Sequence, residues 1–216
     1  MPAEAASRGF TITSFDAIRV DASVEVIVTT GAGASARVEG DQALIDRLKV
    51  DVSGRLLVVT MERARPGEKA GGRAVLRLST GTLGRVVLTG GGSVSVSRMK
   101  GQRGDIVLGG NGDVSVAAVD VDQLNLGVAG AGRATLAGRV GVATVRVNGP
   151  GAVAAEGLRA RQAAVANDGP GNVALTAEVT AKVTASGSGD VTIVGKAACQ
   201  VENRGTGRIS CGGEAY

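Results

Sequence analysis

A short glycine motif recurs from residue 90 onward and constrains the fold more than any other feature. Seven copies of Gly-x-Gly precede alternating apolar and polar residues, as in "GGGSVSV" (90–96), "GNGDVSV" (110–116) and "GSGDVTI" (187–193). Successive copies are separated by 20, 20, 19, 20, 18 and 18 residues. Their leading glycines are Gly90, Gly110, Gly130, Gly149, Gly169, Gly187 and Gly205. A repeat of this length predicts a unit that must stack on its neighbours to bury its core.

Each copy reads as a glycine corner, a strand, a short turn and a second strand that returns to the next corner. Period-two alternation places one set of side chains inside and the other in solvent. In one copy the expected inward set is Val173, Leu175, Val179, Ala181 and Val183. In the next it is Val191, Ile193, Ala197, Cys199 and Val201. We predict an all-β, right-handed parallel β-solenoid with rungs of 18–20 residues, because the hexapeptide period of left-handed solenoids is absent.

The corner glycines have two physical explanations at this point. A corner can require positive φ, which glycine adopts without steric cost, and stacked corners can bring backbones too close for a Cβ. A dinucleotide-binding loop is excluded because no helix follows the glycines. A repeats-in-toxin calcium loop is excluded because its period is about half as long. The residue after each Gly-x-Gly varies and reads as a solvated face: Ser93, Asp113, Arg133, Ala152, Asn172, Asp190 and Arg208.

Residues 10–80 lack the corner repeat but alternate strongly, which predicts an irregular, β-rich N-terminal portion. Asp41 is placed to cap one short helix over 42–48, and 66–72 reads as a loop. We expect residues 1–9 to be a disordered leader. Residues 10–216 then form one domain, with a capping portion over 10–80 and repeat rungs over 81–211.

Composition limits the chemistry that the chain can perform. It has no histidine and two cysteines, which removes the commonest general base and histidine- or cysteine-ligated zinc. Apolar residues make up 44% of the chain, yet aromatic residues only 1%, so valine, alanine and leucine must fill a narrow core. No apolar run approaches the length of a membrane-spanning helix. Few aromatic side chains are present for base stacking, so we do not expect nucleic acid binding.

Charge is unevenly distributed along the chain. Residues 1–54 carry five Lys/Arg and eight Asp/Glu, whereas residues 55–103 carry ten and two. In the basic segment, Arg73, Arg77 and Arg85 have two open interpretations. They either keep an edge strand soluble or form an anion patch for acidic glycans or lipid headgroups.

The N-terminal portion resembles a known family. The resemblance is carried by Phe15-x-x-Ile18-x-Val20, by Val24-x-Val26-x-Val28 and by "VEGDQALIDRLKVDVSGRLLV" (38–58). Together with the later "GNGDVSV" and "GSGDVTI", these segments are similar to the head GIN domain family of autotransporter adhesins, over roughly residues 10–211. The resemblance implies a right-handed β-helix and an exported, envelope-associated bacterial protein with no catalytic residues. Several corners depart from the family's aspartate, with Arg133, Ala152, Asn172 and Arg208 in its place.

Two classes of function follow. The first is a non-enzymatic, exported, adhesin-like protein without a cofactor or metal, located in the periplasm or at the cell surface after signal-peptide removal. It would contact an acidic glycan or an envelope protein, and it could also form a homo-oligomer. The alternative is a carbohydrate-active β-helix enzyme, a lyase or hydrolase. Such an enzyme needs clustered carboxylates, for which the candidates in the repeats are Asp105, Asp113, Asp120, Asp122 and Asp190.

The two cysteines fall on inward positions near the C-terminus. Cys211 occupies the same place in its copy as Ile193 does, and Cys199 lies 12 residues earlier. Opposing walls of a thin solenoid can bring two Cα atoms within the ~4.4–6.8 Å that a disulfide requires. Either a disulfide ties the last rung, or two thiols are buried as small apolar groups.

Overall fold

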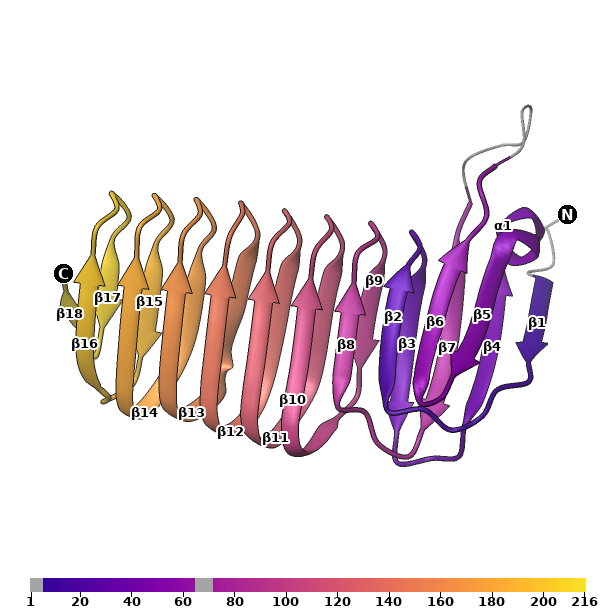
Figure 1. Ribbon diagram of the computed structural model, residues 1–216, viewed down its shortest axis with the longest axis horizontal. Coiled ribbons are helices and arrows are strands. Elements are labelled where there is room, and N and C mark those ends of the chain that lie inside the picture. The colour runs from indigo at the N-terminus through magenta and orange to yellow at the C-terminus, as the bar shows by residue number, and fades with distance from the viewer. Residues whose placement is uncertain (1–5, 65–71) are drawn as a thin grey trace, which may run out of the picture.

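The computed structural model describes residues 6–64 and 72–216 and is almost entirely β (Figure 1). One helix, α1 (Gln42–Arg47), lies in the N-terminal portion. The N-terminal strands are β1 (Ala6–Phe10), β2 (Ala17–Asp21), β3 (Glu25–Thr30), β4 (Ser35–Gly40), β5 (Leu48–Ser53), β6 (Leu56–Met61) and β7 (Ala74–Thr80). The repeats contain β8 (Arg85–Leu88), β9 (Ser93–Val96), β10 (Met99–Leu108), β11 (Asp113–Val128), β12 (Arg133–Val147), β13 (Ala152–Asn167), β14 (Val173–Ala185), β15 (Val191–Val194), β16 (Ala198–Asn203), β17 (Ile209–Cys211) and β18 (Glu214–Ala215).

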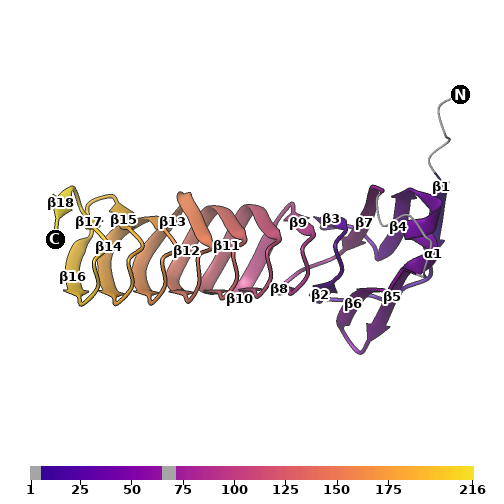
Figure 2. The same cartoon turned by 90° about the horizontal axis from the view of Figure 1, so that it is seen from above.

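The repeats wind into a flat coil with two parallel walls (Figures 1 and 2). Sheet 1 contains β6, β2, β8, the second halves of β10 to β14, and β16. Sheet 2 contains β7, β3, β9, the first halves of β11 to β14, β15 and β17. The Gly-x-Gly corners join the sheets along one edge, the glycine edge. Each long strand bends around the opposite edge, and the coil makes about six turns. The prediction of an all-β solenoid is confirmed.

Part of the N-terminal portion is itself a rung of the solenoid. Strands β2 and β3 pair in parallel with β6 and β7 on one side and with β8 and β9 on the other. The boundary expected at residue 80 therefore does not separate cap from repeat in space. Beyond this rung, β5 pairs antiparallel with β6, β4 with β7, and β1 with β4.

The start of the chain and the helix test two local expectations. Residues 6–9 are not part of a disordered leader, because β1 pairs antiparallel with β4 along its whole length. Residues 1–5, and the loop predicted over 66–72 apart from Gly72, lie outside the described residues. The Asp41 side chain accepts a hydrogen bond from the Ala43 amide at 3.0 Å. The capped helix is thus confirmed, one residue shorter than predicted because Leu48 begins β5.

Inward side chains of the two sheets form one continuous core of Val, Leu, Ile and Ala. The expected inward set of the rung that begins at Gly187 is buried or half-buried. In the preceding rung one expectation is wrong: the exposed fraction of Val179 is 49%, and Ala177 is buried in its place. The cause is a bulge, because Glu178 and Val179 together face the single residue Arg161 of β13. Such an extra residue disrupts the ladder locally, so residues 178–180 are all exposed, while Ala177 and Ala181 on either side remain inward.

Close approach, and not positive φ, explains the corner glycines. None of the glycines of the Gly-x-Gly corners is among the described residues with positive φ. At either glycine of every copy, a Cβ would lie within 3.0 Å of a backbone atom of the preceding corner. At Gly130 it would lie 1.9 Å from the carbonyl oxygen of Gly110. The positive-φ explanation is therefore wrong at these corners, and stacked backbones occupy the space of a side chain.

Candidate functional site

The carboxylates that follow the glycine corners hold the fold together. Asp113 accepts a hydrogen bond from the Arg133 amide at 3.0 Å, and Asp190 accepts one from the Arg208 amide at 2.8 Å. Asn172 does the same for the Asp190 amide at 2.9 Å. The residues after each Gly-x-Gly, interpreted from the sequence as a solvated face, thus include acceptors. Each of these accepts a hydrogen bond from the backbone amide of the equivalent residue in the next rung. These carboxylates are engaged by backbone amides one rung away, which accounts for their position without a catalytic role.

The arginines of the expected anion patch do not share a surface. Arg77 projects from β7 of sheet 2 and pairs with Glu39 at 3.8 Å, and Arg73, directly before β7, pairs with Glu25 at 3.6 Å. Arg85 lies in β8 of sheet 1, on the other wall of the coil. Sequence proximity misled here because the chain crosses from one sheet to the other between β7 and β8. A single patch of these three residues is therefore not formed.

Pairing across strands also accounts for the uneven charge of the sequence. Acidic residues of the first segment neutralise basic residues of the second, as in Asp16 with Arg55 at 2.7 Å and Glu25 with Arg73. The basic run 97–103 has no such acidic partner within the described residues. This run, "SRMKGQR", carries three basic residues and no acidic one, a signal that was present in the sequence.

The edge opposite the glycine edge collects uncompensated cations, and we call it the basic edge. It is formed by the bends at 97–104, 117–122, 137–141, 156–161, 176–180 and 195–197. Its exposed cations are Arg98, Lys100, Arg103, Arg139, Arg159, Arg161 and Lys196. Its exposed acids are Asp120, Asp122, Glu156 and Glu178. None of these side chains forms an ion pair with another described residue.

Strand register arranges some of these charges in a row. Lys100, Asp120, Arg139 and Arg159 are register neighbours in β10, β11, β12 and β13. Parallel strands lie 4.7–4.9 Å apart, so the row extends roughly 14 Å along the solenoid axis. The row presents three cations and one carboxylate, that of Asp120, which leaves a net positive charge toward an extended, negatively charged ligand.

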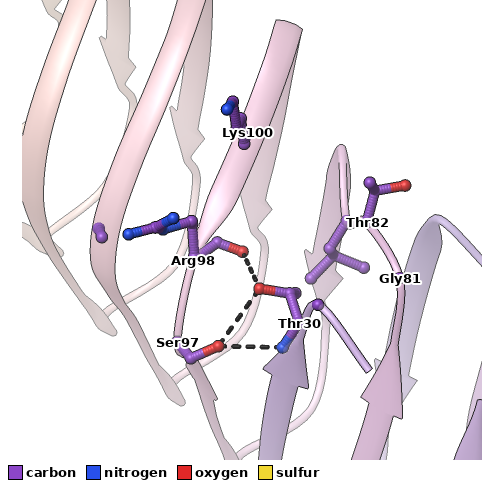
Figure 3. A pocket seen from close by; sticks show the side chains of 9 residues that line it. Thr30, Gly81, Thr82, Ser97, Arg98 and Lys100 are labelled. Atoms are coloured by element: carbon purple, nitrogen blue, oxygen red, sulfur yellow. Dashed lines mark hydrogen bonds between the residues drawn. The ribbon is translucent and has the colours of Figure 1, made fainter. Parts of the chain in front are cut away.

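A pocket of about 420 Å³ lies at the N-terminal end of this edge, and we call it the notch (Figure 3). Ser97, Arg98 and Lys100 line one side, and Gly81 and Thr82 line the other, with Thr30 between them. The full lining is Thr30, Gly31, Gly81, Thr82, Leu83, Ser97, Arg98, Lys100 and Ala118. Hydroxyl groups and two cations thus surround a space beside the first bend of the coil.

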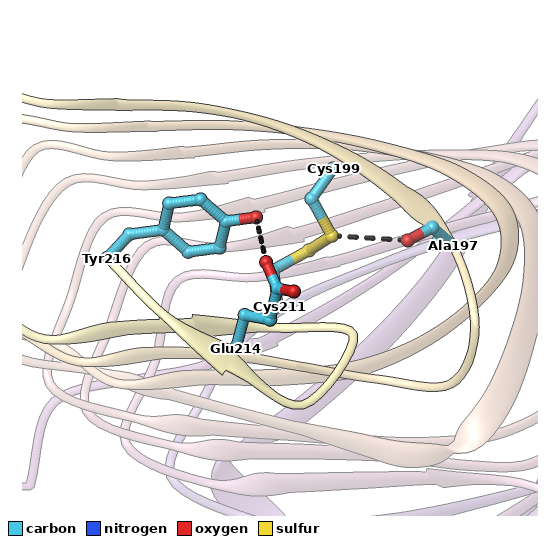
Figure 4. The surroundings of a disulfide bond; sticks show 5 residues. All are labelled: Ala197, Cys199, Cys211, Glu214 and Tyr216. Carbon is cyan, nitrogen blue, oxygen red and sulfur yellow. Dashed lines mark hydrogen bonds between the residues drawn. A yellow bond between two sulfur atoms is a disulfide. The ribbon is translucent and has the colours of Figure 1, made fainter.

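A disulfide joins Cys199 of β16 to Cys211 of β17, with their Cα atoms 6.2 Å apart (Figure 4). It connects the two walls of the last rung. Beyond it, a turn through Gly212 and Gly213 leads into β18, which pairs antiparallel with β17. Of the two alternatives for the cysteines, the disulfide is therefore the one present in the structure.

The family of the chain follows from a comparison of its sequence with protein-family models. The model described as "Putative auto-transporter adhesin, head GIN domain" matches residues 14–197. The chain belongs to this head GIN domain family. No curated protein matches the chain.

Solved structures with the same fold as this head GIN domain protein include three from Bacteroides and Parabacteroides species. A "putative adhesin" from Bacteroides fragilis has a TM-score of 0.89 at 19% identity, covering 96% of this chain and 97% of that one. A "putative lipid binding protein" from Parabacteroides distasonis has a TM-score of 0.74 at 21% identity, covering 97% of both chains. A "putative adhesin" from Parabacteroides merdae has a TM-score of 0.71 at 18% identity, covering 97% of this chain and 96% of that one. At these identities the likeness shows the fold.

Proposed function

We propose that this protein is an exported, non-enzymatic, adhesin-like protein that contacts acidic glycans with its basic edge. The observation that carries the proposal is the uncompensated charge of that edge. Seven exposed cations gather on this edge with only four carboxylates, and none of the seven has a carboxylate partner within 4.0 Å among the described residues, in contrast to Arg55, Arg73 and Arg77 of the N-terminal portion. Unpaired charge on one edge attracts and orients an oppositely charged polymer.

Three further features support a binding role over the alternative of a lyase or hydrolase. The chain has no histidine. The carboxylates of Asp113 and Asp190 each accept a hydrogen bond from a backbone amide, and the two residues lie four corners apart along the solenoid. Over residues 6–64 and 72–216 there is no group of three His, Cys, Asp or Glu residues that could hold a metal ion.

Export is supported by the family and by the disulfide, since disulfides persist in oxidising compartments. Within the described residues no helix is long and apolar enough to cross a membrane. We propose the periplasm or the cell surface as the location.

The test compares binding to immobilised acidic and neutral polysaccharides. We expect saturable binding to polygalacturonate and chondroitin sulfate, weakening steeply with ionic strength, and none to dextran. The same mixtures are assayed for new reducing ends and for unsaturated products. Equal binding to dextran, or polymer cleavage, would contradict the proposal.

A further inference from the structure

The notch exists because the first bend of the basic edge has no rung beneath it. After β3 the chain leaves the coil toward β4, and after β7 it crosses to β8 through residues 81–84. Residues 99–104 of β10 therefore pair with β11 on one side only, whereas residues 105–108 pair with strands on both sides. The unpaired backbone side of this bend borders the notch.

A hydrogen-bond network fixes the floor of the notch. The Thr30 amide donates to the Ser97 hydroxyl oxygen at 3.0 Å, and the Thr30 hydroxyl donates to the Arg98 carbonyl at 3.0 Å (Figure 3). The Ser97 hydroxyl lies 3.3 Å from that of Thr30 and donates to it, because the Thr30 proton is already used. The backbone that carries Arg98 is thus held in place before any ligand arrives.

The charge of the notch is positive and uncompensated. Its lining residues include two cations and no carboxylate. The nearest carboxylate in register is that of Asp120, which follows Lys100 on the β11 side. No described carboxylate lies within 4.0 Å of the Arg98 guanidinium or the Lys100 ammonium group.

We propose that the notch is a discrete subsite for one oxyanion group of a glycan, a carboxylate or a sulfate ester. Arg98 supplies a planar pair of N–H donors, which matches two oxygens of such a group, and Lys100 supplies a compact positive charge. Thr82 lines the opposite side of the notch, with its hydroxyl directed away from Arg98 (Figure 3). The glycan identity rests on the proposed function, whereas the affinity of the notch for an oxyanion does not.

The first test titrates isotope-labelled protein with sodium sulfate and with glucuronate and follows backbone amide shifts by NMR. We expect saturable shifts at Gly81, Thr82 and Arg98. The double variant Arg98→Gln/Lys100→Gln should bind at least about tenfold more weakly, the effect of losing one charge-assisted hydrogen bond. The matched control Arg146→Gln/Lys182→Gln removes equal charge from exposed positions of β12 and β14 outside the basic edge, and its sulfate affinity should stay within about twofold of the unmodified protein.

The subsite is refuted if these amides do not shift, or if both double variants weaken sulfate binding equally. If the subsite is refuted but the protein still binds polygalacturonate, the proposed function stands. Sulfate binding in the notch without any polysaccharide binding refutes the proposed function and retains the subsite. A third arm uses phosphatidylglycerol vesicles, because a lipid headgroup presents the same chemistry. Vesicle binding that depends on Arg98 and Lys100, without polysaccharide binding, would overturn the assignment to a glycan.

Discussion

At the scale of single residues, the stacked corners set the steric rules of this fold. The glycines are needed because each corner lies against the carbonyl oxygens of the one before it, as Gly132 lies against Gly112. The rung of β2 and β3 has Ala22 and Val24 in place of the two glycines, and their backbone atoms are the ones that a Cβ at Gly90 or Gly92 would meet.

Gly130→Ala tests the collision directly. A Cβ there would lie 1.9 Å from the Gly110 oxygen, so we expect a loss of about 1–3 kcal/mol in unfolding free energy. The control is Gly127→Ala, where a Cβ meets no atom within 4 Å and φ is not positive. That variant should be neutral or more stable by up to about 1 kcal/mol. Equal melting temperatures for the two variants would show that the corners do not stack as described.

The carboxylate after a corner gives a second residue-scale prediction. Asp190→Ala removes the acceptor of the Arg208 amide and should cost about 0.5–1.5 kcal/mol in unfolding free energy. Asp190→Asn should preserve most of it, because Asn172 makes the equivalent bond with its side-chain oxygen. Chemical denaturation measures both. An asparagine variant as unstable as the alanine one would mean that charge, and not the hydrogen bond, is what matters.

At the scale of elements, the last rung is held differently from the others. An internal rung is supported on both sides, whereas β16 pairs only with β14. The disulfide closes a segment of 12 residues between β16 and β17. Its main effect is therefore expected on the C-terminal end alone.

Removal of this bond by Cys199→Ser/Cys211→Ser should cost about 3 kcal/mol, from the loop entropy of a segment of this length. In a repeat architecture each rung contacts only its neighbours, so the loss should be local. Hydrogen exchange should accelerate over 198–211 and stay unchanged over 113–147. In denaturant without reductant, the unmodified protein should show no thiol that reacts; two reactive thiols per chain would rule the bond out.

Sequence periodicity predicted the elements better than their irregularities. The alternation gave the inward positions around Val191 and Ile193, because a strict period of two applies where strands are regular. It failed at Val179, where a bulge in β14 exposes residues 178–180 without changing the alternation on either side. It also gave no sign that β2 and β3 form a rung between β6/β7 and β8/β9, since this placement depends on pairing between segments distant in the sequence.

At the scale of the whole molecule, the winding of the chain decides which charges remain free. Arg77 and Arg85 are eight positions apart in sequence yet lie on opposite walls. Arg139 and Arg159 are twenty apart yet are register neighbours. The fold could be read from the repeat, but the candidate site could not, because it depends on the register of stacked strands. Only the acid-free run 97–103 marked it in advance.

The affinity of charge-reversal variants for polygalacturonate tests the central claim most directly. The claim predicts that the variant Arg98→Glu/Arg139→Glu/Arg159→Glu shows no measurable binding at low salt. One cation of the notch and two of the row are replaced by carboxylates, which repel the negatively charged polymer. The matched variant Arg73→Glu/Arg77→Glu/Arg85→Glu changes the net charge equally on the sheet faces, and its affinity should fall far less. If both variants lose binding to the same extent, or if only the second loses it, the basic edge is not the binding site.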